Sequence, residues 1–481
     1  MGGGIASHRL DLKLPPDGSR RDWAAIDRFP YRLDLNNLAI AKTGTMKALI
    51  TLLLGVLLTS GLMTSACGTR SDQSQARSKT ATGADKTATP SEQIRKATLG
   101  HYEIKPSELA TPFATKDAEN QPHIIQRPPG AELQLPGGFA AAIFAEGGFL
   151  QPRWMAQAPN GDVFVADSRA GNIIVLRDTN NDGTSDERFT FASGLNQPFG
   201  MAFWRDYLYV GNTDSVIRFR YRRGQTTAET PPEKIADLPG NGYREHWTRN
   251  LLFNPQGSKL YVTVGSQSDV DVEMEPRASI LEFQPDGSGR RVFASGLRNP
   301  VGLSFNPGSN QLWASVQERD RLGDDLPPDF LTSISPGGFY GWPYTYIGSN
   351  SDPRHQGERH DPPVQALVPD VLFQAHSAVL GLTFYTGAMF PQDHRGDAFV
   401  AMHGSWNRSK RTGYKVVRIH FQNNRPAGGY DDFVAGWMLS EDQSEVWGRP
   451  CGLLVLKDGS MLIADDGANK IWRVTYREPT P

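Results

Sequence analysis

Short apolar segments separated by turn residues run along the chain from about residue 135 onward. Segments such as 173–176, 207–210 and 415–419 are about four to six residues long and are bounded by Gly, Asn, Asp or Pro. This pattern is typical of β-strands joined by tight turns. It favours an all-β domain over a domain built from long helices.

One sequence phrase recurs in this region: a proline, a short gap, an apolar strand, a glycine turn and a second apolar strand. The clearest copies begin at Gly194, Gly296 and Gly448, and related copies begin near Gln151, His246 and Val379. A repeated small sheet cannot bury both of its faces alone, whereas sheets packed radially around an axis can. We therefore predict an all-β fold, a six-bladed β-propeller. A pair of β-sandwiches is the alternative, but it does not require a recurring phrase.

The N-terminal part of the chain carries a targeting pattern. Residues 1–45 are polar and show no period, so we interpret them as an extension that is disordered or foreign to the native protein. Residues 46–67 begin with a positive charge, continue as an apolar run over 48–63 and end on small residues before Cys67, as a signal peptide does. A membrane-spanning helix needs about 20 apolar residues, which is more than this run provides.

The cysteine at the end of this segment resembles the lipidation site of a bacterial lipoprotein. Small residues precede Cys67, although Thr64 stands where such signals usually carry Leu. We therefore predict an exported protein, periplasmic or at the cell surface, that is tethered to a membrane through lipidated Cys67. Export without a lipid and an uncleaved membrane anchor are the alternatives.

The remaining chain divides into a tether and a propeller. Residues 68–98 are rich in Ser, Thr, Ala and Lys and contain no aromatic residue, which is typical of a disordered tether. We assign 68–130 to the tether and a lead-in segment, and 131–478 to the propeller, which we expect to be the catalytic domain.

Charge and cysteine content exclude two classes of protein. The 50 Lys and Arg residues nearly balance 52 Asp and Glu residues, giving a net charge of −2. Nucleic-acid binding needs a strong positive field, so we predict no nucleic-acid partner. Two cysteines in 481 residues exclude a disulfide-rich scaffold. Cys451 lies between Pro450 and Gly452, and we expect its thiol to be buried and unreactive.

Six motifs follow one another along the propeller region. They are residues 245–250 (EHWTRN), 296–300 (GLRNP), 318–320 (ERD), 337–343 (GGFYGWP), 375–377 (AHS) and 448–450 (GRP). With these motifs the chain resembles, over roughly residues 130–477, the soluble pyrroloquinoline quinone (PQQ)-dependent sugar dehydrogenases. The likeness is greatest to their sorbosone and aldose sugar dehydrogenase branch.

The resemblance implies an oxidoreductase that oxidises the C1 hydroxyl of an aldose-type sugar, or a sorbosone-like aldehyde, with PQQ as hydride acceptor. It makes His246 the general base, oriented by Glu245, and places Arg298 and Asn299 against the quinone. A neutral imidazole is a suitable proton acceptor near pH 7, and a guanidinium stabilises negative charge on a quinone. The other residues implied in cofactor binding are Gln197, His376 and Arg449. The basic stretch after residue 405 adds Arg408 and Lys410 as candidates for binding the carboxylates of the cofactor or the substrate, and a solvated loop is the alternative.

The same resemblance implies a Ca²⁺ ion that binds together with PQQ. The main-chain carbonyls of Glu318 and Arg319 would be its ligands, and Ca²⁺ accepts such oxygens in flexible geometry. Independently, a loop over 178–186 spaces oxygen side chains as a calcium loop does. These side chains are Asp178, Asn180, Asp182 and Asp186. A structural Ca²⁺ and a plain Asn/Asp turn are both open for this loop, because Phe189 stands where an EF-hand has Glu.

We expect a small-molecule sugar substrate and an external electron acceptor, since the sequence contains no CxxCH haem motif. Two alternative functions remain. One is a metal-dependent sugar-lactone hydrolase on a propeller, which would need no quinone. The other is a non-enzymatic propeller that binds a partner or a glycan.

Overall fold

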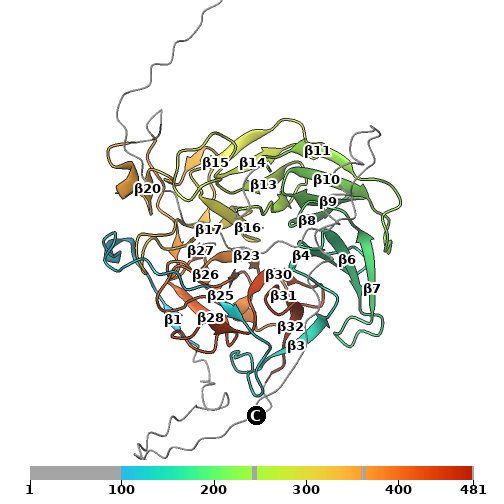
Figure 1. Ribbon diagram of the computed structural model, residues 1–481. Helices are drawn as coiled ribbons and strands as arrows, with labels where there is room; N and C mark the ends of the chain where they lie inside the picture. The colour runs from blue at the N-terminus through green and yellow to red at the C-terminus, as the bar shows by residue number, and fades with distance from the viewer. Residues whose placement is uncertain (1–98, 241–245, 359, 361–363, 479–481) are drawn as a thin grey trace, which may run out of the picture. The chain divides into compact units, whose positions relative to one another are not determined.

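Six β-sheets arranged around a common centre make up the folded part of the chain (Figure 1). A computed structural model describes residues 99–240, 246–358, 360 and 364–478. Within these ranges the helical elements are three short 3-10 helices, at Pro106–Glu108, Pro353–His355 and Gln392–His394. The predicted all-β class is therefore confirmed.

The first three blades follow one another along the chain. Blade 1 contains β4 (Pro152–Gln157), β5 (Val163–Asp167), β6 (Asn172–Arg177) and β7 (Glu187–Ala192). Blade 2 contains β8 (Met201–Trp204), β9 (Tyr207–Asn212), β10 (Ser215–Arg220) and β11 (Glu233–Asp237). Blade 3 contains β12 (Leu251–Phe253), β13 (Leu260–Val264), β14 (Ser279–Phe283) and β15 (Arg291–Ser295), with β19 (Gly338–Phe339) at its edge.

The other three blades take strands from more distant parts of the chain. Blade 4 contains β16 (Asn299–Phe305), β17 (Leu312–Gln317), β18 (Phe330–Ser333) and β22 (Val371–Leu372). Blade 5 contains β23 (Val379–Phe384), β24 (Ala398–Met402), β25 (Lys415–Ile419), β28 (Tyr430–Val434) and β1 (His101–Tyr102). Blade 6 contains β30 (Pro450–Val455), β31 (Met461–Asp465), β32 (Lys470–Tyr476) and β3 (Phe139–Glu146).

Three strand pairs lie outside the blades of the described region. They are β2 (His123–Ile124) with β29 (Glu445–Val446), β20 (Thr345–Tyr346) with β21 (Asn350–Ser351), and β26 (Phe421–Gln422) with β27 (Arg425–Pro426).

The innermost strand of each blade packs against the innermost strand of the next. In ring order these strands are β4, β8, β12, β16, β23 and β30 (Figure 1). Each one follows a copy of the recurring sequence phrase, so the phrase marks the entry into a blade. The prediction of six blades is confirmed.

The ring is closed by strands from the two ends of the propeller. β3 pairs antiparallel with β32, in a register that runs from Phe139 opposite Tyr476 to Glu146 opposite Lys470. β3, which directly precedes blade 1 in the sequence, is thus the outermost strand of the last blade. Closure in this way connects the first and last blades through the segment of chain that leads from β3 into β4.

Glycines in the recurring phrase allow neighbouring innermost strands to approach closely. The four glycines are Gly200, Gly302, Gly381 and Gly452. A Cβ atom placed on Gly381 would lie 2.3 Å from the carbonyl oxygen of Cys451 in β30, and one on Gly302 would lie 2.4 Å from that of Leu380 in β23. Only glycine tolerates these distances, which explains why it recurs in the phrase.

Apolar side chains fill the middle of the ring. Phe199, Val301, Leu380 and Cys451 each precede one of these glycines and belong to one buried cluster. Cys451 is fully buried, and burial raises the pKa of its thiol to about 12. The prediction of a buried, unreactive thiol is therefore confirmed.

The end of the lead-in segment packs onto the propeller. β1 pairs with β28 in blade 5, and β2 pairs with β29 before blade 6. Residues 1–45, the signal segment with Cys67, and the tether over 68–98 lie outside the described residues. Among the residues described, none of the helices has the length and apolar character to cross a membrane.

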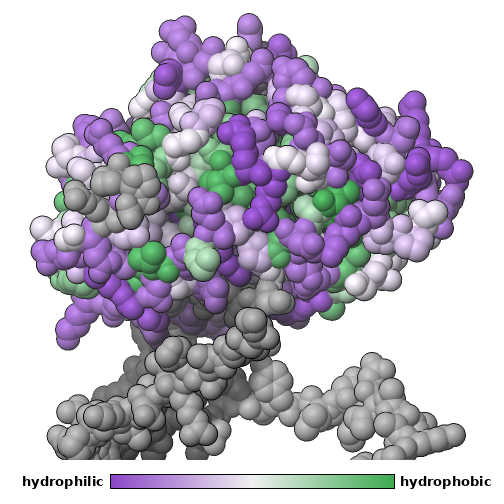
Figure 2. Space-filling view, turned by 90° about the horizontal axis from the view of Figure 1, so that it is seen from above, coloured by the Kyte–Doolittle hydropathy of each residue, from purple (hydrophilic) through white to green (hydrophobic). Residues whose placement is uncertain are grey.

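The outer surface is mainly hydrophilic. Viewed from above, hydrophobic residues form small separate patches among polar ones (Figure 2). Large exposed apolar side chains such as Phe113, Leu150 and Met274 are single exceptions of the kind that most proteins carry.

Replacing Gly381 by Ala should lower the free energy of unfolding by about 2–3 kcal/mol, because the new methyl group must push β23 away from β30. Chemical denaturation would measure the loss. Gly137→Ala is the control, since a Cβ atom there meets nothing within 4 Å, and it should change stability by less than about 0.5 kcal/mol. Equal stability of the two variants would contradict the close approach of the blades.

Candidate active site

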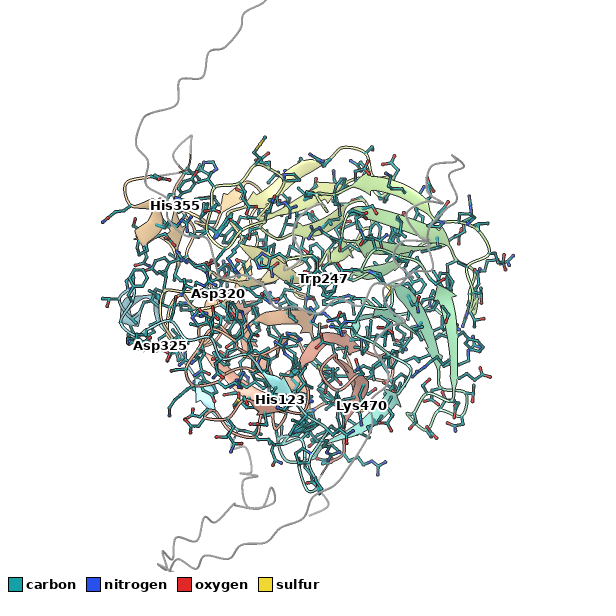
Figure 3. All side chains as sticks on the ribbon, viewed as in Figure 1. His123, Trp247, Asp320, Asp325, His355 and Lys470 are labelled. Atoms are coloured by element: carbon teal, nitrogen blue, oxygen red, sulfur yellow. The ribbon has the colours of Figure 1, made fainter. Side chains whose placement is uncertain are left out.

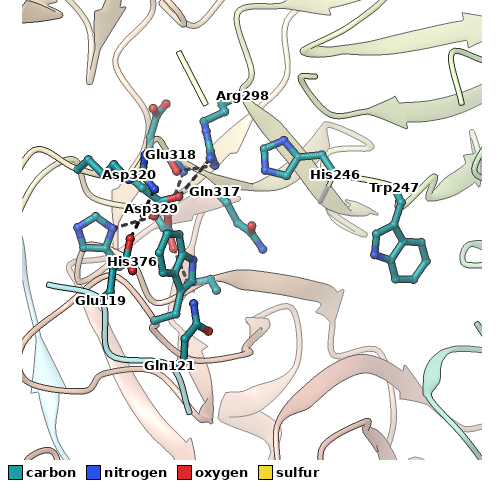
Figure 4. A pocket seen from close by; sticks show the side chains of 13 residues that line it. Glu119, Gln121, His246, Trp247, Arg298, Gln317, Glu318, Asp320, Asp329 and His376 are labelled. Atoms are coloured by element: carbon teal, nitrogen blue, oxygen red, sulfur yellow. Dashed lines mark hydrogen bonds and ion pairs between the residues drawn. The ribbon is translucent and has the colours of Figure 1, made fainter. Parts of the chain in front are cut away.

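A cavity of about 570 Å³ lies at one end of the ring, where polar residues from several strand ends meet (Figure 4). Antiparallel neighbours place the start of each innermost strand beside the end of the next strand, so both contribute to this face. The lining residues are Glu119, Gln121, His246, Trp247, Arg298, Gln317, Glu318, Asp320, Arg321, Asp329, His376, Ala378 and Trp406. Trp247, labelled in Figure 3, lies near the middle of the ring.

His246 lies just before β12 and is buried in the pocket wall. Its Nδ1 atom lies 3.0 Å from Oγ and 3.2 Å from the carbonyl oxygen of Ser266. An Nδ1 proton donated to this carbonyl makes Nε2 the basic nitrogen of the ring. Burial, and then the charge of Arg298, hold the pKa of His246 well below 6.5. The ring is therefore neutral at physiological pH and able to accept a proton.

Arg298 precedes β16 and is held in place on several sides. Nη1 donates to the carbonyl oxygen of Glu318 at 2.8 Å, and Nη2 donates to Oδ1 of Asp269 at 2.9 Å. Nη2 also approaches Oδ2 of Asp320 at 3.3 Å. These bonds fix a planar positive group in the pocket wall with its orientation set before any ligand arrives.

Asp320 links Arg298 to His376, which lies ahead of β23. Nδ1 of His376 lies 3.4 Å from Oδ1 of Asp320, and its Nε2 lies 2.8 Å from the carbonyl oxygen of Gly323. Burial opposes charge on His376, but the bond to Asp320 outweighs burial and raises the pKa of the imidazole. Burial likewise opposes charge on Asp320, yet His376 and Arg298 lower its pKa. This pair is therefore ionic.

Two further acids, Glu318 and Asp329, are buried in the pocket wall, and burial outweighs the effect of the positive groups near them. Burial raises the pKa of Glu318 to about 8 and that of Asp329 to about 6. Asp329 accepts hydrogen bonds from the main-chain nitrogens of Glu318 and Ala378, at 2.9 and 2.7 Å. Oε1 of Glu318 is buried and has no hydrogen-bond partner in the described part of the protein. A cation beside this oxygen would stabilise its ionised form.

The mouth of the pocket is more exposed and contains two indoles. Trp247 and Trp406 are both half-buried and line the pocket. Glu119 and Gln121 come from the segment before the propeller. Oε1 of Glu119 lies 3.7 Å from Nη2 of Arg321, which also lines the pocket. Aromatic faces with polar groups at the rim suit a polar ligand that also has an apolar face.

A second group of charged residues lies next to the pocket, near the axis. Asp466 bonds Nη1 of Arg153 at 2.5 Å and Nε2 of His403 at 2.7 Å. Arg449 donates to the carbonyl oxygen of His403 at 3.0 Å. Burial lowers the pKa of His403 to about 4, so two guanidiniums face one carboxylate here. Arg153 lies 5.3 Å from the ring of Trp247, which joins this group to the pocket.

The sequence matches one protein-family model over residues 133–326 and 351–477. That model describes TrAA12-like proteins. The chain belongs to the TrAA12-like family. The match covers most of the six-bladed region. It leaves out residues 327–350, which include Asp329 of the pocket, and the segment before residue 133, which contributes Glu119 and Gln121.

Relatives of this TrAA12-like protein include a quinone-dependent enzyme. An uncharacterized protein of Borreliella burgdorferi is 31% identical over 72% of this chain and 91% of its own length. The PQQ-dependent pyranose dehydrogenase of Coprinopsis cinerea is 23% identical over 72% of this chain, which spans 54% of that enzyme. The solved holo form of the PQQ domain of a C. cinerea pyranose dehydrogenase has the same fold, with a TM-score of 0.61, 20% identity, and coverage of 74% of this chain and 99% of the domain. The resemblance to the soluble PQQ-dependent sugar dehydrogenase family is confirmed.

The pocket brings together five of the residues expected from the sequence of this TrAA12-like protein. His246, Arg298, Glu318 and His376 line it. Asn299 lies directly behind the wall, where its Nδ2 donates to Oε1 of Gln317 at 3.0 Å. These residues come from blades 3, 4 and 5, which share this part of the ring.

The other expected cofactor ligands lie outside this wall. Arg449 belongs to the charged group around Asp466, beside the pocket. Gln197 is exposed in the turn before β8 and does not line the pocket. Both lie at the predicted strand entrances, but in blades whose entrances contribute less to this cavity.

The basic loop after β24 is engaged with acidic residues of other loops. Arg408 pairs with Oδ1 of Asp325 at 2.7 Å. Lys410 is exposed and pairs with Oε1 of Glu441 at 2.7 Å. Neither side chain lines the cavity. The sequence marked the loop as basic, while the acids that pair with it lie far away in the chain.

The two carbonyls expected to bind Ca²⁺ have different surroundings. The Glu318 carbonyl accepts the hydrogen bond from Arg298, and the oxygen of Glu318 that lacks a partner belongs to its side chain. The side chain of Arg319 points to Asp352, to which Nη1 donates at 2.7 Å. Glu245, expected to orient His246, lies outside the described residues.

Most polar groups of the loop over 178–186 bond within the loop, but Oδ1 of Asp178 is buried and has no hydrogen-bond partner among the described residues. Asp186 accepts from the main chain and hydroxyl of Thr179, Asp182 accepts from Thr184, and Asp178 accepts from Gly183. Asn180 donates to Asp182 at 3.0 Å. Throughout the described ranges, no three side chains of His, Cys, Asp or Glu are grouped to hold a metal ion by themselves. The bonds within the loop are those of an Asn/Asp turn, whereas the unpartnered Oδ1 of Asp178 suits a cation, so both interpretations of the loop stay open.

Two features of the site were not visible in the sequence. Asp329 stands alone before an apolar strand, and nothing in its flanks marks it as part of a pocket. Glu119 and Gln121 lie in a stretch that was read only as lead-in. Their position in the sequence did not predict a place in the pocket, because the residues that they join there lie about 200 positions away in the chain.

Replacing Glu318 by Gln should stabilise the protein without added cofactor or calcium at pH 8. The folded-state pKa of Glu318 rises from 4.5 to about 8, so its ionisation destabilises the fold progressively as pH rises between these values. We expect a gain of about 2–4 kcal/mol at pH 8 and almost none at pH 4.

Thermal unfolding of both proteins across this pH range is the measurement. Glu132→Gln, on the surface before β3, is the control and should leave the difference near zero at every pH. A stability gain that is the same at pH 4 and pH 8 would contradict a raised pKa.

Proposed function

We propose that the protein is a PQQ- and Ca²⁺-dependent dehydrogenase that oxidises the C1 hydroxyl of an aldose-type sugar. The observation that carries the proposal is a neutral buried imidazole, His246, beside a fixed guanidinium, Arg298, in one pocket. Removing hydrogen from a C1–OH group requires a proton acceptor together with a group that stabilises negative charge on the oxidant. The pyranose dehydrogenase relative supports PQQ as that oxidant.

His246 takes the proton in this proposal. Nδ1 is held by Ser266, so Nε2 would receive the proton of the C1 hydroxyl. Burial, and then the positive charge of Arg298, lower the pKa of His246 and keep the imidazole neutral beforehand. When bound, PQQ supplies the oxidising power by accepting the C1 hydrogen as a hydride. The sugar would then leave as a lactone, having lost one proton to His246 and one hydride from C1, which together are two protons and two electrons.

The residues of the pocket fit an acidic, planar cofactor. Arg298 presents a fixed positive group, the His376–Asp320 pair sits beside it, and Arg153 and Arg449 add buried positive charge near the axis. Guanidiniums recognise carboxylates with two parallel hydrogen bonds. We infer that Arg298 and Arg449 bind and orient PQQ, whereas Arg408 and Lys410 serve to join loops.

Ca²⁺ fits the acids at the base of the pocket. Oε1 of Glu318 is a potential metal ligand that has no hydrogen-bond partner among the described residues. A cation beside it would offset the cost of ionising this buried acid. Because the described side chains form no complete metal site, the ion would need further oxygens from the main chain and from the cofactor. We therefore expect Ca²⁺ and PQQ to bind together rather than separately.

Export and a lipid tether at Cys67 remain part of the proposal. They rest on the signal-like sequence over 46–67. An enzyme without its own haem would pass electrons to an external acceptor, as expected from the sequence.

PQQ should bind tightly in the presence of Ca²⁺ and much more weakly in EDTA, as measured by calorimetry on the purified protein. Arg298→Ala should weaken PQQ binding by at least about tenfold, because a charged hydrogen-bonding group is lost. Arg290→Ala, at an exposed turn of blade 3, is the matched control. Absence of PQQ binding by the wild-type protein with Ca²⁺ would overturn the proposal. Lactone hydrolysis without PQQ would instead favour a lactone hydrolase.

Replacing His246 by Asn should preserve PQQ binding and lower kcat for aldose oxidation by about 100-fold or more, because the proton acceptor is removed. Dye reduction with a panel of aldoses is the measurement, and exposed His101→Asn is the control. In the wild type, the acid limb of kcat/KM should lie below pH 6.5, since the pKa of His246 is depressed. An acid limb above pH 6.5 would argue against His246 as the base.

A further inference from the structure

An extended segment before the propeller crosses the face that carries the pocket. We call residues 111–125 the strap. Its main chain bonds to the propeller along its length: Phe113 N donates to Leu322 O at 2.8 Å, Asn120 N donates to Trp406 O at 2.7 Å, and Ile125 N donates to Val446 O at 2.9 Å. The strap is thus fixed to loops of blades 4, 5 and 6.

Asn120 determines which way its neighbours point. Its Nδ2 donates to the carbonyl oxygens of Arg408 and Ser409, at 3.2 and 3.1 Å, and its Oδ1 accepts from Arg411 at 2.5 Å. Side chains alternate in direction along an extended chain. With Asn120 turned into the loop after β24, the residues on either side of it, Glu119 and Gln121, both line the pocket (Figure 4).

These two side chains lie at a different depth from the reacting groups. His246, Arg298 and His376 are each at most 6% exposed, whereas the Glu119 side chain is 73% exposed. A sugar with C1 at His246 therefore extends outward past the strap. Carboxylate and amide groups are suitable partners for the hydroxyls at the far side of a sugar ring, and Trp406, whose main chain holds the strap, offers an aromatic face.

We propose that the strap is the substrate-recognition element of the enzyme, with Glu119 and Gln121 binding sugar hydroxyls remote from C1. This inference rests on the proposed sugar oxidation. The family match begins at residue 133, so the strap is a part of the pocket that the family model does not describe. The proposed oxidation and the choice of sugar would thus be carried by separate parts of the chain.

The test compares Glu119→Ala, Gln121→Ala and a matched control, Asp117→Asn, which lies on the same strap but does not line the pocket. PQQ- and Ca²⁺-loaded enzymes are assayed with glucose, its C4 epimer galactose, and xylose, which lacks C6. We expect KM to rise by about tenfold for Glu119→Ala and about fivefold for Gln121→Ala with at least one sugar. The value of kcat should stay within about twofold, and the ranking of the three sugars should change.

Two readouts separate this inference from the proposed function. PQQ affinity should be the same in all four proteins, and saturation-transfer NMR should show weaker sugar binding in the two pocket variants. If the wild type oxidises sugars and both pocket variants keep its KM and ranking, the strap has no recognition role. If the wild type binds PQQ but neither binds nor oxidises any of the sugars, both proposals are wrong. A changed PQQ affinity in the strap variants would also overturn recognition, since the strap would then hold the cofactor.

Discussion

The pairing of β3 with β32 is the interaction on which the arrangement of the whole molecule depends. It joins residues 139–146 to 470–476, and through them the first and last blades. Bringing together ends so far apart in the chain costs entropy that a ladder of main-chain hydrogen bonds and buried side chains must offset. Once the ring is closed, each innermost strand is confined between two neighbours, and the pocket at their ends has a defined shape.

Close confinement of the innermost strands explains both the glycines and the electrostatics of the site. Where Gly302 and Gly381 let main chains touch, no room remains for water. Charged groups at the adjacent strand ends are consequently buried, and their protonation depends on their neighbours. Asp320 and His376 stabilise each other as ions, whereas burial outweighs the charge of Arg298 at Glu318 and keeps this acid neutral near pH 7.

The pocket combines a rigid interior with an added outer wall. Its interior is built from blade entrances that recur in the sequence and match the TrAA12-like family model. Its rim includes Glu119 and Gln121, which reach the cavity because the strap is bonded to loops from three blades. The residues that react at the base of the pocket and those that recognise the substrate at its rim could then evolve independently, since substitutions in the strap need not disturb the closed ring.

The sequence alone determined the strands, the six blades and the burial of Cys451, because these depend on local patterns that repeat. Its resemblance to a known family pointed to His246, Arg298 and His376, and all three line the pocket in the structure. Tertiary structure alone decided that β3 completes blade 6, that Asp329 and the strap join the pocket, and that Arg408 and Lys410 pair with acids outside it. These contacts and the raised pKa of Glu318 depend on residues that are distant in the chain, so the local sequence does not predict them.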